Sequence, residues 1–499
     1  MIEAQQSVEA PVNEALQPDQ FAALLNQEFS LEKRSDEHRT RVRTAVRTLA
    51  EQVLDDASVV SSDVVHSIGA LIAEIDTKLS EQINQILHHD EFQKLEGAWQ
   101  GLSHLVNNTE TDTMLKIRIL DVSKRDLHRN LRKFKGTAWD QSPIFKKMYE
   151  EEYGQFGGQP FGCIVGDYHF DHSASDVELL KEMSKIAASA HCPFISGVAP
   201  STLQMDSWQE LSNPRDLKKI FDTPEYAAWR SLRNSDDSRY VGLAMPRFLA
   251  RLPYGAKTDP IDEFNFEEET EDGDSGKYTW ANSAYAMATN VTRAFKHYGW
   301  CARIRGIESG GVVENLPVHT FPTEDGGVAM KCPTEIAITD RREKELADIG
   351  LMPLLHKKNE DLAAFIGAQS LHLPVQYEGR DGKMATANAN LSARLPYMFA
   401  VSRFAHYLKC MGRDKVGSFT SRDELQRWLS DWIHNYIDFD PTRSSDADKA
   451  RKPLVDASID VVEDEENPGY YKATFLLKPH YQFEGMTVSL RLASRINKE

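Results

Sequence analysis

Residues 83–106 read INQILHHDEFQKLEGAWQGLSHLV, with the polar group His88-His89-Asp90-Glu91 inside an otherwise apolar pattern. Apolar positions at steps of three and four lie on both sides of this group, as they do on one face of a helix. They are Ile83, Ile86 and Leu87 before it, and Leu95, Trp99, Leu102 and Val106 after it. The spacing predicts helical segments that meet at the polar group.

The residue types of this polar group are those of metal ligands, but their spacing is not. Neighbouring residues on a helix point about 100° apart, so His88, His89, Asp90 and Glu91 do not converge on one ion. The HExxH pattern, which places two histidines on one helix face, is absent. A capping and turn role at a helix junction is favoured over a metal site.

The chain before this stretch predicts a polar arm, residues 1–40, followed by a long helical region, residues 41–110. Two stripes at helical spacing predict two antiparallel helices in that region. They are Val42, Val46, Leu49 and Val53, and Val65, Ile68, Ile72, Ile75, Leu79, Ile83 and Ile86. The arm contains a short predicted helix, 18–29, whose apolar face consists of Phe21, Leu24, Leu25 and Phe29. That face suits either a groove on a partner or packing on its own domain, and spacing does not distinguish the two.

Residues 111–445 alternate between apolar strand-like runs and helical patterns. The runs are 115–120, 161–166, 194–198, 240–245, 302–307 and 334–338, and the helical segments are 124–133, 143–152, 174–189, 280–298, 341–349, 386–411 and 422–437. This order predicts a mixed α/β core with some parallel pairing. Residues 441–451 are predicted to link this core to the C-terminal part.

The C-terminal part, residues 446–499, predicts two strands, 470–479 and 485–493. In the second strand Val488, Leu490 and Leu492 face one way and polar residues face the other. Such a terminal strand can pair within its own sheet or add to the sheet edge of a neighbouring molecule.

Composition excludes several classes of function. The formal charge of −18 argues against nucleic acid or an anionic membrane as the main partner. The N-terminus lacks the features of a signal peptide, and no apolar run reaches the length of a membrane span, so a cytoplasmic protein is expected. Five scattered cysteines predict neither a disulfide framework nor a zinc ribbon.

One alternative is an α/β hydrolase or metal-dependent enzyme that uses the His169–His172 region. Those residues follow a predicted strand, where α/β enzymes place catalytic groups, and Cys163 and Cys192 are expected nearby. No third group is spaced to complete a triad, and no nucleotide-binding motif occurs. The acidic segment 262–274 lacks EF-hand spacing and is expected to be a solvated loop rather than a cation site.

A family resemblance is carried by blocks that occur in order along the chain. They include HDEFQKLEGAWQGL at 89–102, SRYVGLAMPR at 238–247, YGWCARIRG at 298–306, ARLPY at 393–397 and PHYQFEG at 479–485. The sequence resembles the large subunit of the type VI secretion contractile sheath, the TssC/VipB family.

This resemblance implies a structural subunit with no catalytic residues, cofactor or metal. The implied partners are the small sheath subunit (TssB/VipA), other copies of the chain, the inner tube protein Hcp, the baseplate and the AAA+ unfoldase ClpV. The helix with Phe21, Leu24, Leu25 and Phe29 would bind the unfoldase. The strand with Val488, Leu490 and Leu492 would be exchanged between subunits. Trp99 and Leu102 would pack in the core or against the small subunit, which would complete the α/β core.

Overall fold

The computed structural model describes Thr44 and residues 64–213, 216–262, 264–270, 274–322, 326–379, 382–414, 422–463, 470–480 and 494–497. The predicted helix at 18–29, the predicted helix at 42–53 apart from Thr44, and the strand residues Val488, Leu490 and Leu492 lie outside the described residues. The chain divides into two units, Met1–Phe92 with Pro253–Lys277, and Gln93–Leu252 with Tyr278–Glu499, and each is described by itself. In the described part of the chain, no helix combines the length and the apolar character that crossing a membrane requires.

The predicted helix junction is confirmed. Helix α3 (Val64–Leu87) is followed by a turn at His88 and His89 and then by α4 (Asp90–Asn107). The Nδ1 atom of His89 accepts a hydrogen bond from the Glu91 amide at 3.3 Å, which satisfies a donor at the start of α4. Asp90 and Glu91 lie in the first turn, where carboxylates interact favourably with the helix dipole.

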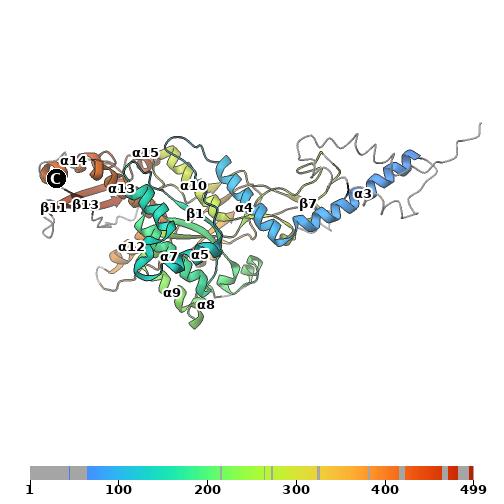
Figure 1. Cartoon of the computed structure of the whole chain (residues 1–499), viewed down its shortest axis with the longest axis horizontal. Coiled ribbons are helices and arrows are strands. Elements are labelled where there is room, and N and C mark those ends of the chain that lie inside the picture. The colour runs from blue at the N-terminus through green and yellow to red at the C-terminus, as the bar shows by residue number, and fades with distance from the viewer. Residues whose placement is uncertain are drawn as a thin grey trace, which may run out of the picture. The chain divides into compact units, whose positions relative to one another are not determined.

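A six-stranded mixed sheet forms the centre of the second unit (Figure 1), which confirms the mixed α/β core. Its order is β1 (Ile164–Phe170), β2 (Phe194–Val198), β3 (Val241–Met245), β9 (Leu351–His356), β10 (Ala363–Phe365) and β6 (Val312–Val313). The first four strands are parallel, and β10 pairs antiparallel with both β9 and β6.

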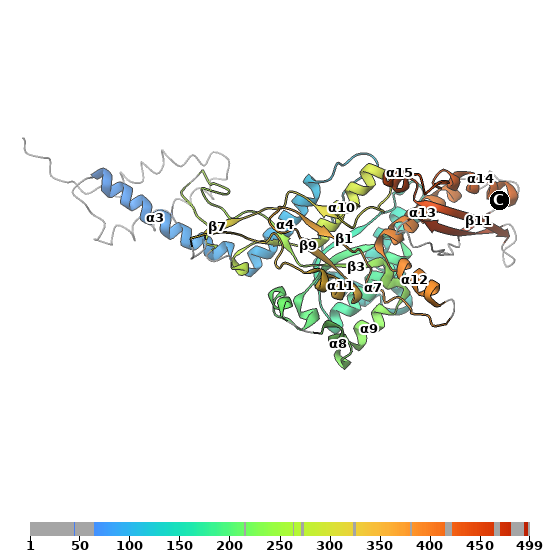
Figure 2. The same cartoon turned by 180° about the vertical axis from the view of Figure 1, so that it is seen from behind.

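Helices cover both faces of this sheet because its strands are apolar on both faces. Along β2, Phe194 belongs to one hydrophobic cluster and Ile195 to the other. The first cluster includes α7 (Ala174–Ser189), and the second includes α10 (Ser283–Tyr298) and Leu105 of α4. Figure 2 shows α7 and α10 on opposite sides of β3.

Shorter elements surround these layers. The helices are α5 (Lys124–Lys133), α6 (Pro143–Phe145), α8 (Leu217–Phe221), α9 (Ala227–Arg233), α11 (Asp340–Asp348), α12 (Gly382–Ser392) and α15 (Asp446–Arg451), with a π-helix at Lys146–Gly154. Short 3₁₀ helices lie at Gly136–Gln141, Pro200–Leu203, Trp208–Ser212, Pro224–Tyr226, Asp236–Tyr240 and, in the first unit, Ser275–Lys277. Two strand pairs are β4 (Phe248–Leu249) with β5 (Trp280–Ala281), and β7 (Thr320–Pro322) with β8 (Val328–Met330).

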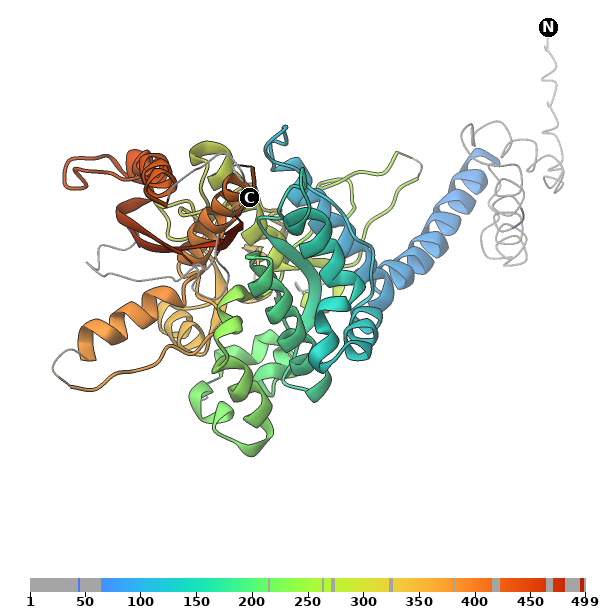
Figure 3. The same ribbon diagram turned by 60° about the vertical axis from the view of Figure 1, so that its left-hand side comes forward.

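The C-terminal part of the second unit has its own core and is coloured orange to red in Figure 3. Helices α13 (Leu395–Asp414) and α14 (Arg422–His434) contribute apolar residues to the same cluster as β11 (Leu454–Glu463) and β12 (Tyr470–Pro479). The strand at 470–479 is therefore confirmed. A short strand, β13 (Ser494–Asn497), pairs antiparallel with the first residues of β12.

Several predicted elements are wrong. Residues 115–120, 302–307 and 334–338 are not strands. At 302–307 the chain turns at Gly306, which has a φ of 73°. At 334–338 the β-pairing is a single bridge between Thr334 and Phe248, next to Pro333, which has no N–H to donate. These segments therefore have the alternating apolar and polar side chains of a strand but, apart from this bridge, no neighbouring strand pairs with them among the described residues.

Three boundaries also differ. Strand β1 extends through Phe170, so His169 lies within the strand rather than after it. The predicted helix at 386–411 is two helices, with a break between Ser392 and Leu395. The predicted linker at 441–451 contains α15.

Candidate functional site

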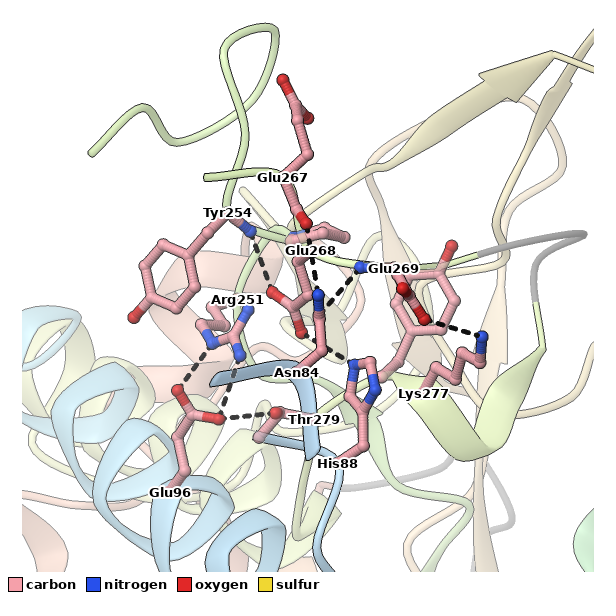
Figure 4. A network of polar contacts seen from close by, with 12 residues as sticks. Asn84, His88, Glu96, Arg251, Tyr254, Glu267, Glu268, Glu269, Lys277 and Thr279 are labelled. Carbon is pink, nitrogen blue, oxygen red and sulfur yellow. Dashed lines mark hydrogen bonds and ion pairs between the residues drawn. The ribbon is translucent and has the colours of Figure 1, made fainter. Parts of the chain in front are cut away.

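The acidic segment around Glu268 is bound to the end of α3, as Figure 4 shows. The Asn84 side chain donates to the Glu267 carbonyl at 3.4 Å and accepts from the Glu269 amide at 3.0 Å. One side-chain amide thus satisfies two main-chain groups, as a neighbouring strand would. Asn84 itself is buried.

His88 and Glu268 strengthen this attachment. The Nε2 atom of His88 lies 3.5 Å from Oε1 of Glu268, whose Oε2 accepts a hydrogen bond from the Tyr254 amide at 2.9 Å. The Glu268 side chain is only 2% exposed. The expectation of a solvated acidic loop is therefore wrong for this residue. The described residues contain no group of three or more potential metal ligands.

In the second unit, two glycines bring α4 close to the segment that follows Tyr278, and one ion pair joins α4 to Arg251. A Cβ atom on Gly97 would lie 2.4 Å from the Trp280 carbonyl oxygen, and one on Gly101 would lie 2.4 Å from the Tyr285 ring. Glycine is therefore required for this close approach. Next to them, Glu96 forms a buried ion pair with Arg251 and accepts a hydrogen bond from the Thr279 hydroxyl at 2.6 Å (Figure 4).

The opposite face of α4 is apolar and exposed. The exposed fractions are 57% for Leu95, 64% for Trp99 and 43% for Val106. Leu102 is half-buried and packs against the second hydrophobic cluster. Trp99 is thus not a core residue of the described chain, and its face of α4 is a candidate contact surface.

The C-terminal sheet has an incomplete edge. Strand β13 pairs with β12 from Tyr470↔Asn497 to Ala473↔Ser494 only. On that side, the rest of β12, from Thr474 to Pro479, has no strand partner among the described residues. Unpaired main-chain groups of this kind are able to accept an added strand.

Burial or packing, rather than activation, characterises the histidines and cysteines considered for catalysis. Burial, together with the nearby cations Arg247 and Lys124, lowers the pKa of His169 to about 3. His172 stacks on Tyr226 with 4.5 Å between ring centroids. Burial raises the pKa of both Cys163 and Cys192, so neither thiol is an activated nucleophile.

Sequence reasoning missed Asn84, Glu96, Arg251 and Glu268. The sequence contained a hint for Asn84, because it is a polar residue next to Ile83 in an apolar stripe. Nothing in the sequence pairs Glu96 with Arg251, because 155 positions separate them.

Comparisons with known proteins agree with a structural role. Residues 69–372 match the family VipB, described as "EvpB/VC_A0108, tail sheath N-terminal domain", and residues 384–496 match VipB_2, described as "EvpB/VC_A0108, tail sheath gpW/gp25-like domain". The chain is 66% identical over 480 residues to the type VI secretion system sheath protein TssC1 of Pseudomonas aeruginosa, covering 96% of this chain and 95% of that protein. A chain in the structure of the anti-feeding prophage baseplate gives a TM-score of 0.36 at 9% identity, covering 77% of this chain and 84% of that one, and nothing is inferred from it.

The family matches and the 66% identical relative define a tail-sheath protein, which is a structural protein and not an enzyme. The hypothesis of a hydrolase or metal enzyme at His169–His172 is therefore wrong. The chain belongs to the TssC/VipB family of type VI secretion sheath proteins, as the sequence blocks predicted.

Proposed function

We propose that this chain pairs with a small sheath subunit (TssB/VipA), that the pairs polymerise in the cytoplasm around a tube of Hcp, and that the sheath starts at a baseplate. The observation that carries the pairing is the exposed apolar face of α4. Leu95, Trp99 and Val106 are exposed on a helix whose opposite face is fixed by Gly97 and Gly101. Exposed apolar residues at helical spacing are typical of contact surfaces.

Neighbouring copies would be joined by exchange of the C-terminal strand that contains Val488, Leu490 and Leu492. The edge of β12 from Thr474 to Pro479, which has no second strand partner among the described residues, supports this proposal, because it offers main-chain groups to an added strand. Each main-chain hydrogen bond adds about 1 kcal/mol net, and many copies act along a filament.

Contraction would be a rigid-body change between two packings of the same subunits, so the stroke itself needs no nucleotide. The apolar helix with Phe21, Leu24, Leu25 and Phe29 would then be the element that ClpV binds when it dismantles the contracted sheath. In this proposal residues 1–40 are the arm, 41–110 the helical region, 111–445 the core and 446–499 the strand-exchange part.

Co-expression with the small subunit tests the proposal. Pelleting followed by negative-stain microscopy should show long hollow tubules that contain both chains. A soluble chain that binds no small subunit would contradict the pairing, and a soluble pair without tubules would contradict polymerisation.

A further inference from the structure

The main chain between α4 and α5 has unused hydrogen-bonding capacity. Within the described residues, no amide or carbonyl group of residues 116–121 has a hydrogen-bond partner. The segment is held by side chains instead: Lys116 donates to Gln159 at 2.9 Å, and Arg118 forms an ion pair with Glu152. Just after the segment, the Val122 carbonyl accepts from the Tyr168 hydroxyl at 2.8 Å.

The same segment has the side-chain pattern of a strand. Leu115 and Ile117 are half-buried, whereas Lys116 and Arg118 are exposed, so exposure alternates along the chain. Ile119 is 68% exposed and Leu120 is 46% exposed. Apolar and charged residues that alternate at 116–119, with main-chain groups that have no partner among the described residues, fit a strand that lacks its partner.

Its position in the fold supports this interpretation. Strand β1 is at the end of the six-stranded sheet, so its outer edge has no strand partner in the described part of the chain. Ile117 packs against the same hydrophobic cluster as Val165 of β1. Ile117 therefore attaches the unpaired segment to the sheet layer, while Ile119 and Leu120 remain exposed.

We propose that residues 116–121 pair with a strand from the small sheath subunit, through main-chain hydrogen bonds. This rests on the proposed pairing of the two subunits and specifies where part of it occurs. The segment follows α4, whose exposed face we assign to the same partner, so the two surfaces are continuous along the chain. A neighbouring copy is not the expected donor, because we assign its C-terminal strand to the edge of β12 from Thr474 to Pro479 instead.

The partner strand has a defined chemistry. It is extended, contributes alternating main-chain donors and acceptors, and carries apolar side chains that cover Ile119 or Leu120 on the side it faces. Recognition of this kind depends on main-chain groups first and on side chains second.

Hydrogen exchange measured on the assembled sheath and on the chain alone tests the proposal. Alternate amides within 116–121 should exchange at least about 10-fold more slowly in the sheath, since every second amide of an edge strand faces its partner. Unchanged exchange at all six amides, in a sheath that does form, would overturn the strand pairing while leaving the proposed function intact. If no small subunit binds, both the pairing and this proposal fail.

Two neighbouring substitutions separate main-chain pairing from side-chain contact. Ile119→Pro and Leu120→Pro each remove one amide from an exposed position, and the two amides point to opposite sides of a strand. One variant should weaken binding of the small subunit about 10-fold or more, and the other much less. Equal losses would overturn pairing along one edge. Ile119→Thr keeps the amide and the β-branched shape, and it should bind within a few-fold of the unmodified chain.

A photo-reactive amino acid at position 119 identifies the partner. In the assembled sheath, its cross-link should join this chain to the small subunit. A cross-link to a second copy of this chain would overturn the assignment of the donor.

Discussion

The guanidinium group of Arg251 lies alongside the carboxylate of Glu96, with Nε–Oε1 at 2.6 Å and Nη2–Oε2 at 3.1 Å. Both side chains are about nine-tenths buried, at 9% and 11% exposed. This two-point ion pair fixes α4 on the body of the second unit, so the direction of its exposed face depends on it.

Glu96→Ala should lower the free energy of unfolding by about 3 kcal/mol, because it leaves the Arg251 charge buried without its partner. Urea unfolding of the purified chain measures the change. Glu91→Ala removes an exposed carboxylate from the same helix and is expected to cost less than 1 kcal/mol. Equal effects of the two substitutions would show that the buried pair does not stabilise the fold.

Gly101→Ala should destabilise the chain by about 1–3 kcal/mol, because the new methyl group meets the Tyr285 ring at 2.4 Å. Gly69→Ala in α3 is the matched control. Among the described residues, no atom outside the helix's own backbone lies within 4 Å of the added methyl group there, so this variant should gain about 0.5–1 kcal/mol from helix propensity. The prediction is wrong if both variants shift the thermal midpoint in the same direction.

Trp99→Asp should abolish or strongly reduce tubule formation without lowering the stability of the chain, because Trp99 is mostly exposed and contributes little to its core. Pelleting with the small subunit gives the assembly readout, and urea unfolding gives the stability readout. Asn107→Asp places the same charge at another exposed position of α4, about 100° around the helix from Val106, and should leave tubules intact. Normal tubules from Trp99→Asp would exclude this face as a required contact.

The chain should lose stability in acid because of His406 and His191. His406 donates from Nε2 to the Ala190 carbonyl at 2.8 Å, and burial lowers its pKa to about 3. Burial also lowers the pKa of His191, which bonds to the Tyr240 hydroxyl, to about 4. Both residues bind protons more readily when unfolded, so stability falls as the pH drops below the unfolded pKa of about 6.5.

The loss attributable to His406 should be on the order of 3 kcal/mol by pH 4. Urea unfolding between pH 7 and pH 4 measures it. His406→Gln keeps a donor for the Ala190 carbonyl and should make the pH dependence shallower. An unchanged pH dependence in His406→Gln would contradict the prediction.

Deleting residues 485–499 should abolish tubules while leaving the pairing with the small subunit intact, because the exchanged strand is proposed to join neighbouring pairs. Pull-down of the small subunit and electron microscopy separate the two steps. Removing only residues 498–499 keeps β13 and should preserve tubules. Normal tubules from the longer deletion would refute strand exchange.

The local sequence pattern was sufficient to predict helices and strands whose apolar residues follow one period throughout. The predicted helix at 174–189 is α7, and the predicted strand at 194–198 is β2, because their apolar spacing matches one period without interruption. The segment 115–120 has the alternation of a strand but no neighbour within the described chain, so sequence alone could not show whether it pairs.

The local sequence pattern could not predict contacts between residues that are far apart in the chain. Asn84 contacts the main chain at Glu267, 183 positions later, and this contact binds the acidic segment that composition alone would leave in solvent. The same limit applies to Trp99, whose helical spacing suits a core helix and a docking helix equally.

The long ladder between β11 and β12 has a mechanical consequence. Nine residue pairs join the two strands, from Leu454↔Pro479 to Glu463↔Tyr471. A pull on the end of β12 along the strand direction loads these pairs in shear, so they resist together rather than opening one after another. A neighbouring subunit that pulls on this sheet would therefore extend the chain segments that connect the sheet to the rest of the unit before it separates β11 from β12.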